Sequence, residues 1–498
     1  MTAAPAAWDV VVVGGGNAGL CAAVRAAQLG ARVCLLEKAP QARRGGNSSL
    51  TVNLRFAYRA RAELAALLAP AAAERLAARA AAPAYPPEAF LDDLVRASDG
   101  RCDRALAETV ARASWPTVLW LRELGHAWEL REGERPGAVP VRLDGGGAAL
   151  QERSFTLAEE LGVEIAYEAA AAGLLVRDDA VAGVEARTPA GSRRFHAANV
   201  VLASGGFECD PALRRRHLGP AWEHVRVRGV PYNTGDGLTM ALALGAAPAG
   251  DWSAAHAPPQ DLAAPESTLP GGHFLVQVQS RYSFQYGVTV NSEGRRFYDE
   301  GEHYGNYTYG AFGARLLAQP QPLAYQIFDD RALRAGLVAP AYFLATGTVT
   351  AETIPALADG IGVPRETLAR TLAAYNRAAP DAREHFSTAR RDGLATVGLE
   401  PPKSNWALRI ERPPFRAFPV TLGLTFTYGG LRIDPQARVL RADGTPIAGL
   451  YAAGEIVGGL FYRNYPGGSG MMAGAVFGKR AAEDALRRLA APRGATPR

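Results

Sequence analysis

The residues best placed to do chemistry begin with a glycine-rich run, Gly-Gly-Gly-Asn-Ala-Gly at positions 14–19. The run directly follows an apolar segment at 10–13 and leads into a segment expected to be helical at 20–29. Glu37 closes the next apolar segment, 18 positions after the last of these glycines. Glycines in this spacing allow a tight turn and a close approach to a pyrophosphate, and the acid can hold ribose hydroxyls. The pattern predicts a βαβ unit that binds an adenine dinucleotide at the N-terminus of its helix.

Three further motifs favour FAD over a nicotinamide dinucleotide. A loop at 44–49, Arg-Gly-Gly-Asn-Ser-Ser, follows the βαβ unit, where small residues can pass under an isoalloxazine ring. Thr-Gly-Asp-Gly at 234–237 precedes an expected helix, and Ala-Gly-Glu at 453–455 ends an apolar segment. A nicotinamide enzyme has no obvious use for the first of these motifs.

Apolar segments that end in glycine must position these motifs, and they recur at the beginning, middle and end of the chain. Besides 10–13, residues 199–203 run into Ser-Gly-Gly and residues 450–453 run into Gly-Glu. A glycine-punctuated helix is expected at 469–489. The sequence between about 256 and 402 is instead rich in aromatic residues and turns. This order predicts one nucleotide-binding domain interrupted by an insertion.

Together, these motifs resemble those of the fumarate reductase/succinate dehydrogenase flavoprotein family along nearly the whole chain. Ser-Gly-Gly-Phe at 204–207 and Gly-Gly-Ser-Gly at 467–470 complete the set. The resemblance implies an α/β fold with a Rossmann-like FAD-binding domain built from both chain ends, residues 1–255 and 406–498. It also implies an α+β capping domain, residues 256–405, inserted between them.

The same resemblance implies FAD as the cofactor. FAD is expected to bind non-covalently, because Gln-Ala-Arg-Arg at 41–44 stands where some family members have the histidine that links FAD covalently. Glu455 is expected to contact the ribityl chain, and the helix from Ser469 to point its N-terminus at the flavin, where its dipole stabilises the reduced ring. The expected FAD-binding residues are Gly14, Gly16, Asn17, Ala18, Gly19, Glu37, Lys38, Gly45, Gly46, Asn47, Ser48, Ala203, Gly205, Gly206, Thr234, Gly235, Asp236, Gly454, Glu455, Gly468, Ser469, Gly470 and Met471.

Members of this family interconvert a carbon–carbon single and double bond next to a carbonyl or carboxylate. One hydrogen moves as a hydride at flavin N5 and the other as a proton. His256 resembles the family histidine that binds the substrate's carbonyl or carboxyl group, with His273 and His303 as weaker candidates. Tyr304 stands four residues after Glu300, where ketone desaturases have a tyrosine base and fumarate reductases an arginine. A phenol with an ordinary pKa of about 10 needs partners to act as that base.

Three fumarate-reductase side chains are missing from the matching positions. Leu333 stands where fumarate reductases have the arginine that acts as the proton donor. The substrate-binding histidine before a Gly-Gly pair is replaced within residues 425–430. Tyr465 stands where those enzymes have an arginine that binds the substrate carboxylate. In ketone desaturases the hydroxyl of this tyrosine and a following backbone N–H hold the carbonyl oxygen while the enolate forms. The catalytic residues expected are Tyr304, Tyr465 and His256, and the other substrate contacts expected are Phe426, Tyr428, Gly468 and Ser469.

The resemblance therefore favours an FAD-dependent dehydrogenase that introduces a double bond α,β to a carbonyl or carboxylate of a small molecule. Ketones and small polycarboxylates both stay open as substrates, because residues 299–302 and 424–428 resemble tricarballylate dehydrogenases. The alternatives are a reductase that uses Arg331 or Arg334 as proton donor, and an FAD protein of cofactor biosynthesis without desaturation. The arginines that could bind a carboxylate are Arg55, Arg281, Arg295 and Arg463.

Composition narrows the remaining possibilities. The 498 residues are 48% hydrophobic and 21% charged, which excludes a disordered chain. The net charge of +5 is spread without a long basic run, which argues against nucleic-acid binding. Four cysteines without a CxxC pair exclude zinc ribbons, iron–sulfur clusters and CxxCH haem attachment, and no metal site is expected. No segment is typical of a signal peptide or membrane span, so we expect a cytoplasmic protein. Because no haem, iron–sulfur or NAD site is expected, its electrons should leave to a diffusible acceptor, namely a quinone, a flavoprotein or oxygen.

Overall fold

The computed structural model describes residues 8–79, 84–131, 139–268, 278–381 and 383–490, and its main sheet has eight strands. Five of them are parallel, in the order β19, β8, β1, β2, β5. Their bounds are β1 Trp8–Val13, β2 Val33–Leu36, β5 Glu164–Ala166, β8 Gly191–Leu202 and β19 Pro446–Ala452. Strands from both ends of the chain thus lie side by side, with an antiparallel strand, β18 (Arg438–Leu440), at one edge.

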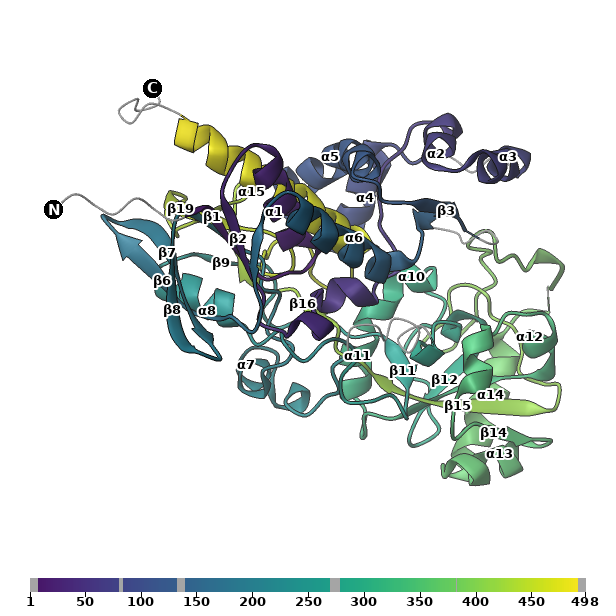
Figure 1. Ribbon diagram of the computed structural model, residues 1–498. Coiled ribbons are helices and arrows are strands. Elements are labelled where there is room, and N and C mark those ends of the chain that lie inside the picture. The colour runs from purple at the N-terminus through teal and green to yellow at the C-terminus, as the bar shows by residue number, and fades with distance from the viewer. Residues whose placement is uncertain (1–7, 80–83, 132–138, 269–277, 382, 491–498) are drawn as a thin grey trace.

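Two helices from opposite ends of the chain cover this sheet together. Helix α1 (Asn17–Gln28) and the C-terminal helix α15 (Ser469–Ala490) pack against each other (Figure 1). A Cβ atom on Gly478 would lie 2.2 Å from the carbonyl oxygen of Ala18, so only glycine allows this close approach. The apolar run of β1 is buried because helices and loops cover both faces of the sheet.

Strand β8 is longer than the apolar segment 199–203 indicates. Its first half forms an antiparallel ribbon with β7 (Ala180–Thr188), which in turn pairs with β6 (Ala170–Arg177). The residues at 191–194 are polar and exposed, so no apolar pattern marks this half in the sequence. Only the buried half of β8 enters the parallel sheet.

A second sheet of five antiparallel strands lies in the lower right of Figure 1 and has its own apolar core. Its strands are β11 (Pro259–Asp261), β12 (Val288–Asn291), β13 (Ala324–Phe328), β14 (Val349–Ala351) and β15 (Phe415–Leu422). Helices α13 (Ile354–Ile361) and α14 (Arg365–Ala378) pack onto this core. The chain then returns to the main sheet through β18 and β19.

Two short strands, one before and one after the second sheet in the chain, pair with each other. Strand β10 (Ala255–His256) pairs with β16 (Phe426–Thr427), and His256 faces Phe426 across the pairing. The pairing therefore holds two expected substrate contacts in register.

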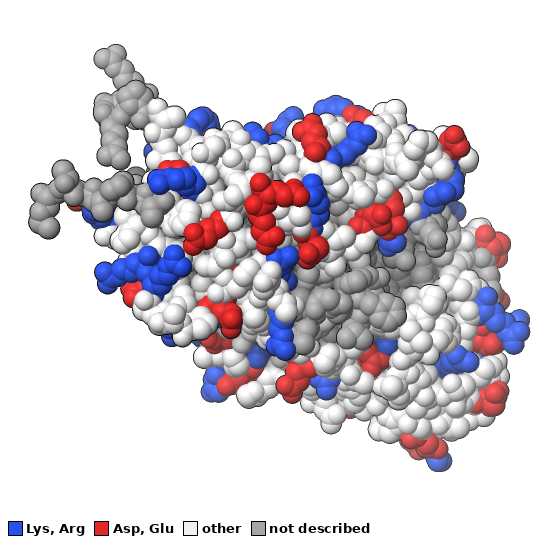
Figure 2. All heavy atoms as spheres, viewed as in Figure 1, with Lys and Arg blue, Asp and Glu red and all other residues white. Residues whose placement is uncertain are grey.

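The remaining elements complete the two regions. They are α2 Arg61–Leu67, α3 Pro70–Ala78, α4 Pro87–Ala97, α5 Arg104–Glu123, β3 Trp128–Leu130, β4 Val141–Leu143, α6 Gly146–Glu160, α7 Pro211–His217, α8 Asp236–Ala243, β9 Pro248–Ala249, α10 Gly305–Thr308, α11 Phe312–Leu317, α12 Asp330–Arg334 and β17 Gly430–Leu431. Within the described ranges, none of the helices is both long and apolar enough to cross a membrane. On the face drawn in Figure 2, acidic and basic side chains are interspersed.

Candidate active site

A cavity lies at the carboxyl ends of the parallel strands, where Val13, Leu36, Ala203 and Gly454 contribute to its wall. Ligands of open α/β sheets bind at this edge. The predicted residues that line the cavity are Gly14, Gly16, Asn17, Ala18, Glu37, Lys38, Gly46, Asn47, Ser48, Ala203, Gly205, Asp236, Phe426, Tyr428, Gly454, Glu455, Tyr465, Gly470 and Met471. The glycine motifs, which are far apart in the sequence, therefore meet at one site.

Other predicted residues do not line the cavity. They are Gly19, Gly45, Gly206, Thr234, Gly235, His256, Tyr304, Gly468 and Ser469. Gly19 serves packing, since a Cβ atom there would lie 1.9 Å from the carbonyl oxygen of Gly14. Thr234 accepts a hydrogen bond from Lys38, so it positions a lining residue.

The acidic residue after β2 is held by backbone amides. The carboxylate of Glu37 accepts hydrogen bonds from the N–H groups of Gly15 at 2.8 Å and Ala39 at 2.7 Å. Burial raises the pKa of Glu37, and these amide donors oppose the shift. Beside it, the ammonium group of Lys38 lies 2.8 Å from a carboxylate oxygen of Asp236. One end of the cavity thus carries one acid and one lysine–aspartate pair.

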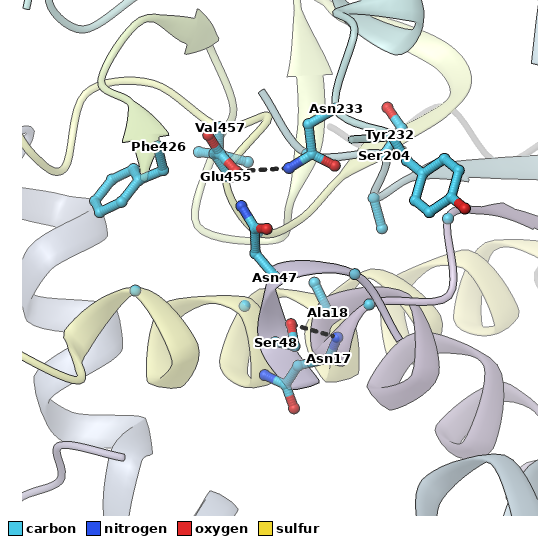
Figure 3. A pocket seen from close by; sticks show the side chains of 18 of the residues that line it. Asn17, Ala18, Asn47, Ser48, Ser204, Tyr232, Asn233, Phe426, Glu455 and Val457 are labelled. Atoms are coloured by element: carbon cyan, nitrogen blue, oxygen red, sulfur yellow. Dashed lines mark hydrogen bonds between the residues drawn. The ribbon is translucent and has the colours of Figure 1, made fainter. Parts of the chain in front are cut away.

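Asn17 and Ser48 join three segments of the cavity wall. The backbone N–H of Asn17 donates to Ser48 Oγ at 3.0 Å (Figure 3), and its side-chain amide donates to the carbonyl of Met471 at 2.8 Å. The loop at 44–49 is therefore fixed to the first turn of α1, and that turn is fixed to the first turn of α15.

Two buried carboxyl groups, those of Glu208 and Glu455, interact with each other, and Glu455 lines the cavity. Asn233 donates to Glu455 at 3.4 Å (Figure 3). Asn233 also donates to Glu208 at 2.6 Å, and Asn47 donates to Glu208 at 3.0 Å. Burial raises the pKa of both groups, and repulsion from Glu208 raises that of Glu455 further. Two buried carboxylates side by side repel each other, so the raised pKa values favour a state in which at least one of them is protonated.

The sequence analysis missed Glu208 and Asn233. Each stands next to a recognised motif, Glu208 one residue after 204–207 and Asn233 one residue before 234–237. Their positions beside these motifs were the only available signal.

The raised pKa of Glu208 makes stability depend on pH. Because the pKa of Glu208 is raised to about 7 on folding, its contribution is fully present below the ordinary pKa of 4.5 and is lost as the pH rises through about 7. Each pKa unit of that shift corresponds to about 1.4 kcal/mol. We expect Glu208→Gln to melt at a temperature that, relative to the natural protein, rises from about pH 5 to about pH 7 and then levels off. A temperature difference that does not change with pH, measured by circular dichroism with saturating FAD, contradicts the raised pKa of Glu208.

The opposite end of the cavity is aromatic. Tyr465, Phe426 and Phe461 line it, and the ring of His256 lies behind them, with its centroid 4.8 Å from that of Tyr465 and 5.1 Å from that of Phe426. Burial, assisted by the charge of Arg228, holds the pKa of His256 well below its usual value, so this imidazole is neutral at pH 7. Among the described residues that line the cavity, the one cation is Lys38, at the other end.

Tyr309, five residues after Tyr304, lies at this aromatic end. Its ring centroid is 4.7 Å from that of His256 and 6.3 Å from that of Tyr465. The phenols of Tyr309 and Tyr465 interact electrostatically. Burial and the two tyrosines Tyr465 and Tyr282 raise the pKa of Tyr309 well above 10, and Arg228 opposes the shift.

Tyr304 lies further away. Its hydroxyl donates to the carbonyl of Ala389 at 3.3 Å, and its ring packs on Trp406 and His303. His303 contacts Tyr307 rather than the cavity wall. His273 lies outside the described residues.

The arginines considered as proton donors or carboxylate clamps are engaged elsewhere. Arg331 pairs with Glu411 at 2.6 Å, and the side chain of Arg334 is 80% exposed beside Asp330. Arg55 and Arg281 are buried against Asp93 and Asp261, respectively. Arg295 pairs with Glu293, and Arg463 with Asp99 and Glu302.

A family described as FAD binding domain matches residues 9–471 of this chain. The chain belongs to this family. A probable fumarate reductase from Shewanella frigidimarina is 27% identical over 96% of this FAD-binding chain and 75% of its own length. A 3-oxosteroid 1-dehydrogenase from Mycolicibacterium smegmatis is 31% identical, covering 67% of this chain and 61% of its own length. A 4-oxocyclohexanecarboxylate 2-dehydrogenase from Sinomonas cyclohexanicum is 30% identical, covering 64% of this chain and 55% of its own length.

A solved structure supports the same conclusion. The open conformation of a flavocytochrome c3 fumarate reductase is similar with a TM-score of 0.72 and 25% identity, covering 97% of this chain and 79% of that one. This FAD-binding protein is therefore an oxidoreductase that acts on CH–CH groups and uses FAD.

The residues of the cavity fit FAD. Ser204 Oγ lines the cavity and is buried without a partner, as expected for a site that a polar ligand completes. The first turn of α1 would hold the pyrophosphate, Glu37 the ribose, and the loop at 44–49 the isoalloxazine ring. When bound there, FAD supplies the hydride acceptor of the reaction.

Proposed function

We propose that the protein desaturates a small ketone, forming a C=C bond between the carbons α and β to the carbonyl. The observation that carries this proposal is the uncharged, hydroxyl-bearing wall around Tyr465, which suits a carbonyl oxygen. A dicarboxylate would need cations, and the described lining residues place only Lys38 in the wall, paired with Asp236. The two relatives named as dehydrogenases of oxo compounds support the same choice.

Tyr465 and the start of α15 would hold the carbonyl oxygen. The N–H of Gly468 donates to Tyr465 Oη at 3.4 Å, and that of Ser469 donates to the carbonyl of Pro466 at 3.0 Å. The next residues, Gly470 and Met471, line the cavity at the first turn of a 22-residue helix. Donors at such a helix start stabilise the negative charge that develops on the oxygen as the α-proton leaves. The oxygen contacts are thus proposed at Gly470 and Met471, two residues further along than Gly468 and Ser469.

Tyr309 would take the α-proton. Its phenol is next to Tyr465 and His256, whereas Tyr304 bonds Ala389. The α C–H electron pair becomes part of the new C=C bond, the proton goes to the Tyr309 oxygen, and the β-hydrogen leaves with its pair to the bound cofactor. Tyr304, the sequence-based candidate, is kept as the alternative base, and His256 is kept as a substrate anchor.

The finer organisation is also proposed. Residues 1–255 and 406–498 would form the FAD-binding part, and residues 256–405 the capping part. Among the described strands, β15 pairs with β11, β13 and β14 of the second sheet and with no strand of the main sheet, which favours a boundary after Leu422 for the cap. Gln-Ala-Arg-Arg at 41–44 supports non-covalent FAD. Electrons would leave to a quinone, a flavoprotein or oxygen.

Anaerobic reduction of the bound flavin tests the proposed function. The panel contains cyclohexanone, 4-oxocyclohexanecarboxylate, a 3-ketosteroid, succinate and tricarballylate. We expect at least one ketone to bleach the flavin absorbance within seconds while succinate and tricarballylate do not. Bleaching by the carboxylates alone would overturn the ketone assignment. Reduced enzyme that is reoxidised faster by fumarate or an enone than by oxygen would instead indicate a reductase.

A further inference from the structure

Several buried polar atoms around the aromatic end lack hydrogen-bond partners. They are His256 Nδ1, Tyr428 Oη, Tyr282 Oη and Arg228 Nε. The first two both lie beside Gly310, close to the cavity wall. Unsatisfied buried groups are costly, and a cluster of them indicates a polar ligand that completes their bonding.

A row of rings connects this wall to Arg228. The ring centroid of His256 lies 4.8 Å from that of Tyr465 and 4.7 Å from that of Tyr309. The centroid of Tyr282 in turn lies 5.0 Å from that of Tyr309. The guanidinium carbon of Arg228 lies 6.0 Å from the centroid of Tyr282. The two unsatisfied atoms of Tyr282 and Arg228 are therefore at the end of the row that is away from Tyr465.

Arg228 is the unusual member of this row. It donates to Thr425 Oγ1 at 3.4 Å and Ser280 Oγ at 3.1 Å, both neutral hydroxyls. Within the described part of the chain, Arg228 forms no ion pair with a carboxylate, unlike the buried Arg55 and Arg281. The side chain is half-buried, and its Nε is buried without a hydrogen-bond partner. A partly desolvated guanidinium without a counter-ion is less favourable until an anion binds it.

We propose that Arg228, with the hydroxyl of Tyr282, binds a carboxylate on the substrate, at the end opposite the reacting ketone. This inference rests on the proposed ketone desaturation and narrows it to keto acids. Thr425, which contacts Arg228 and lines the cavity, places this subsite next to the space the substrate would occupy. The neutral wall at Tyr465 and the unpaired cation at Arg228 then match the two ends of one molecule.

Single-turnover flavin reduction tests this with a matched pair of ketones, 4-oxocyclohexanecarboxylate and cyclohexanone. We expect the natural protein to prefer the carboxylated ketone and Arg228→Gln to lower kcat/KM for it by at least about 30-fold, since a charged contact in a partly desolvated site is lost. Cyclohexanone should change by less than about 3-fold. Arg228→Lys should retain part of the preference, and Tyr282→Phe should lose a smaller part. Equal losses for both ketones, or no preference in the natural protein, would overturn the subsite.

A control and a binding measurement separate this inference from the proposed function. Arg226→Gln removes a nearby arginine that bonds the carbonyls of Leu262 and Ala264, and it should leave the preference unchanged. Benzoate, which cannot be desaturated, should perturb the spectrum of the oxidised flavin in the natural protein and bind at least about 30-fold more weakly to Arg228→Gln. If neither ketone reduces the flavin but benzoate behaves as expected, the ketone desaturation fails and the anion subsite stands. If the ketones react but benzoate binds both proteins equally, only the subsite fails.

Discussion

Replacing Tyr309 by Phe should slow anaerobic reduction of the flavin by a ketone about 100- to 10,000-fold, the usual contribution of a positioned general base. The ring stays and only the hydroxyl that contacts Tyr465 is lost, so the aromatic wall keeps its shape. Because burial holds the pKa of Tyr309 well above 10, the reactive phenolate is scarce at neutral pH. The rate in the natural protein should therefore rise about tenfold per pH unit from pH 7 to pH 9.5, without a plateau. Stopped-flow absorbance of the flavin measures both effects.

Tyr304→Phe is the matched control for this experiment. Its hydroxyl donates to the carbonyl of Ala389, away from the cavity wall, so its loss should change the rate by less than about threefold. If Tyr304→Phe abolishes the reaction and Tyr309→Phe does not, the base is the residue that the family motif indicates. That result would also mean that the second sheet moves relative to the main sheet when substrate binds.

Replacing Tyr465 by Phe should lower kcat about 100- to 1,000-fold, the effect of removing one donor to a developing oxyanion. The donor acts mainly in the transition state, so KM should change little. Bound FAD should be retained, because the ring still covers the cavity and the contact between Asn17 and Met471 is untouched.

Tyr462→Phe controls for changes in the same loop. Its ring packs on Arg101, with 4.6 Å between the guanidinium carbon and the ring centroid, and it does not line the cavity. We expect its kcat to match that of the natural protein. A Tyr465→Phe variant that loses substrate binding but keeps kcat would show that the hydroxyl serves binding in the ground state only.

The glycine motifs pointed to one shared cavity because their function is steric. A backbone that approaches a pyrophosphate or another helix excludes a Cβ atom, and the sequence shows this requirement directly. Glu208 and Asn233 follow no such rule, since a buried hydrogen-bonded pair can come from any two segments that the fold brings together. Spacing also could not choose between Tyr304 and Tyr309. They flank the short helix α10, and the rotation of that helix decides which phenol faces His256. The sequence did not mark Arg228, because its distinguishing feature is that no carboxylate among the described residues pairs with it. Only the structure shows which groups surround it.

The order of strands in the main sheet has a consequence for how the protein is made. β8 is complete by residue 202, but its neighbour β19 begins only at residue 446. While about half of the chain is being synthesised, one edge of the buried, apolar half of β8 has no partner, which is a typical starting point for aggregation. Met471, whose carbonyl holds Asn17, is made later still. The nascent chain therefore cannot complete its cofactor site until translation is nearly finished, and yield in the cell should depend on chaperones and on the supply of FAD at that moment.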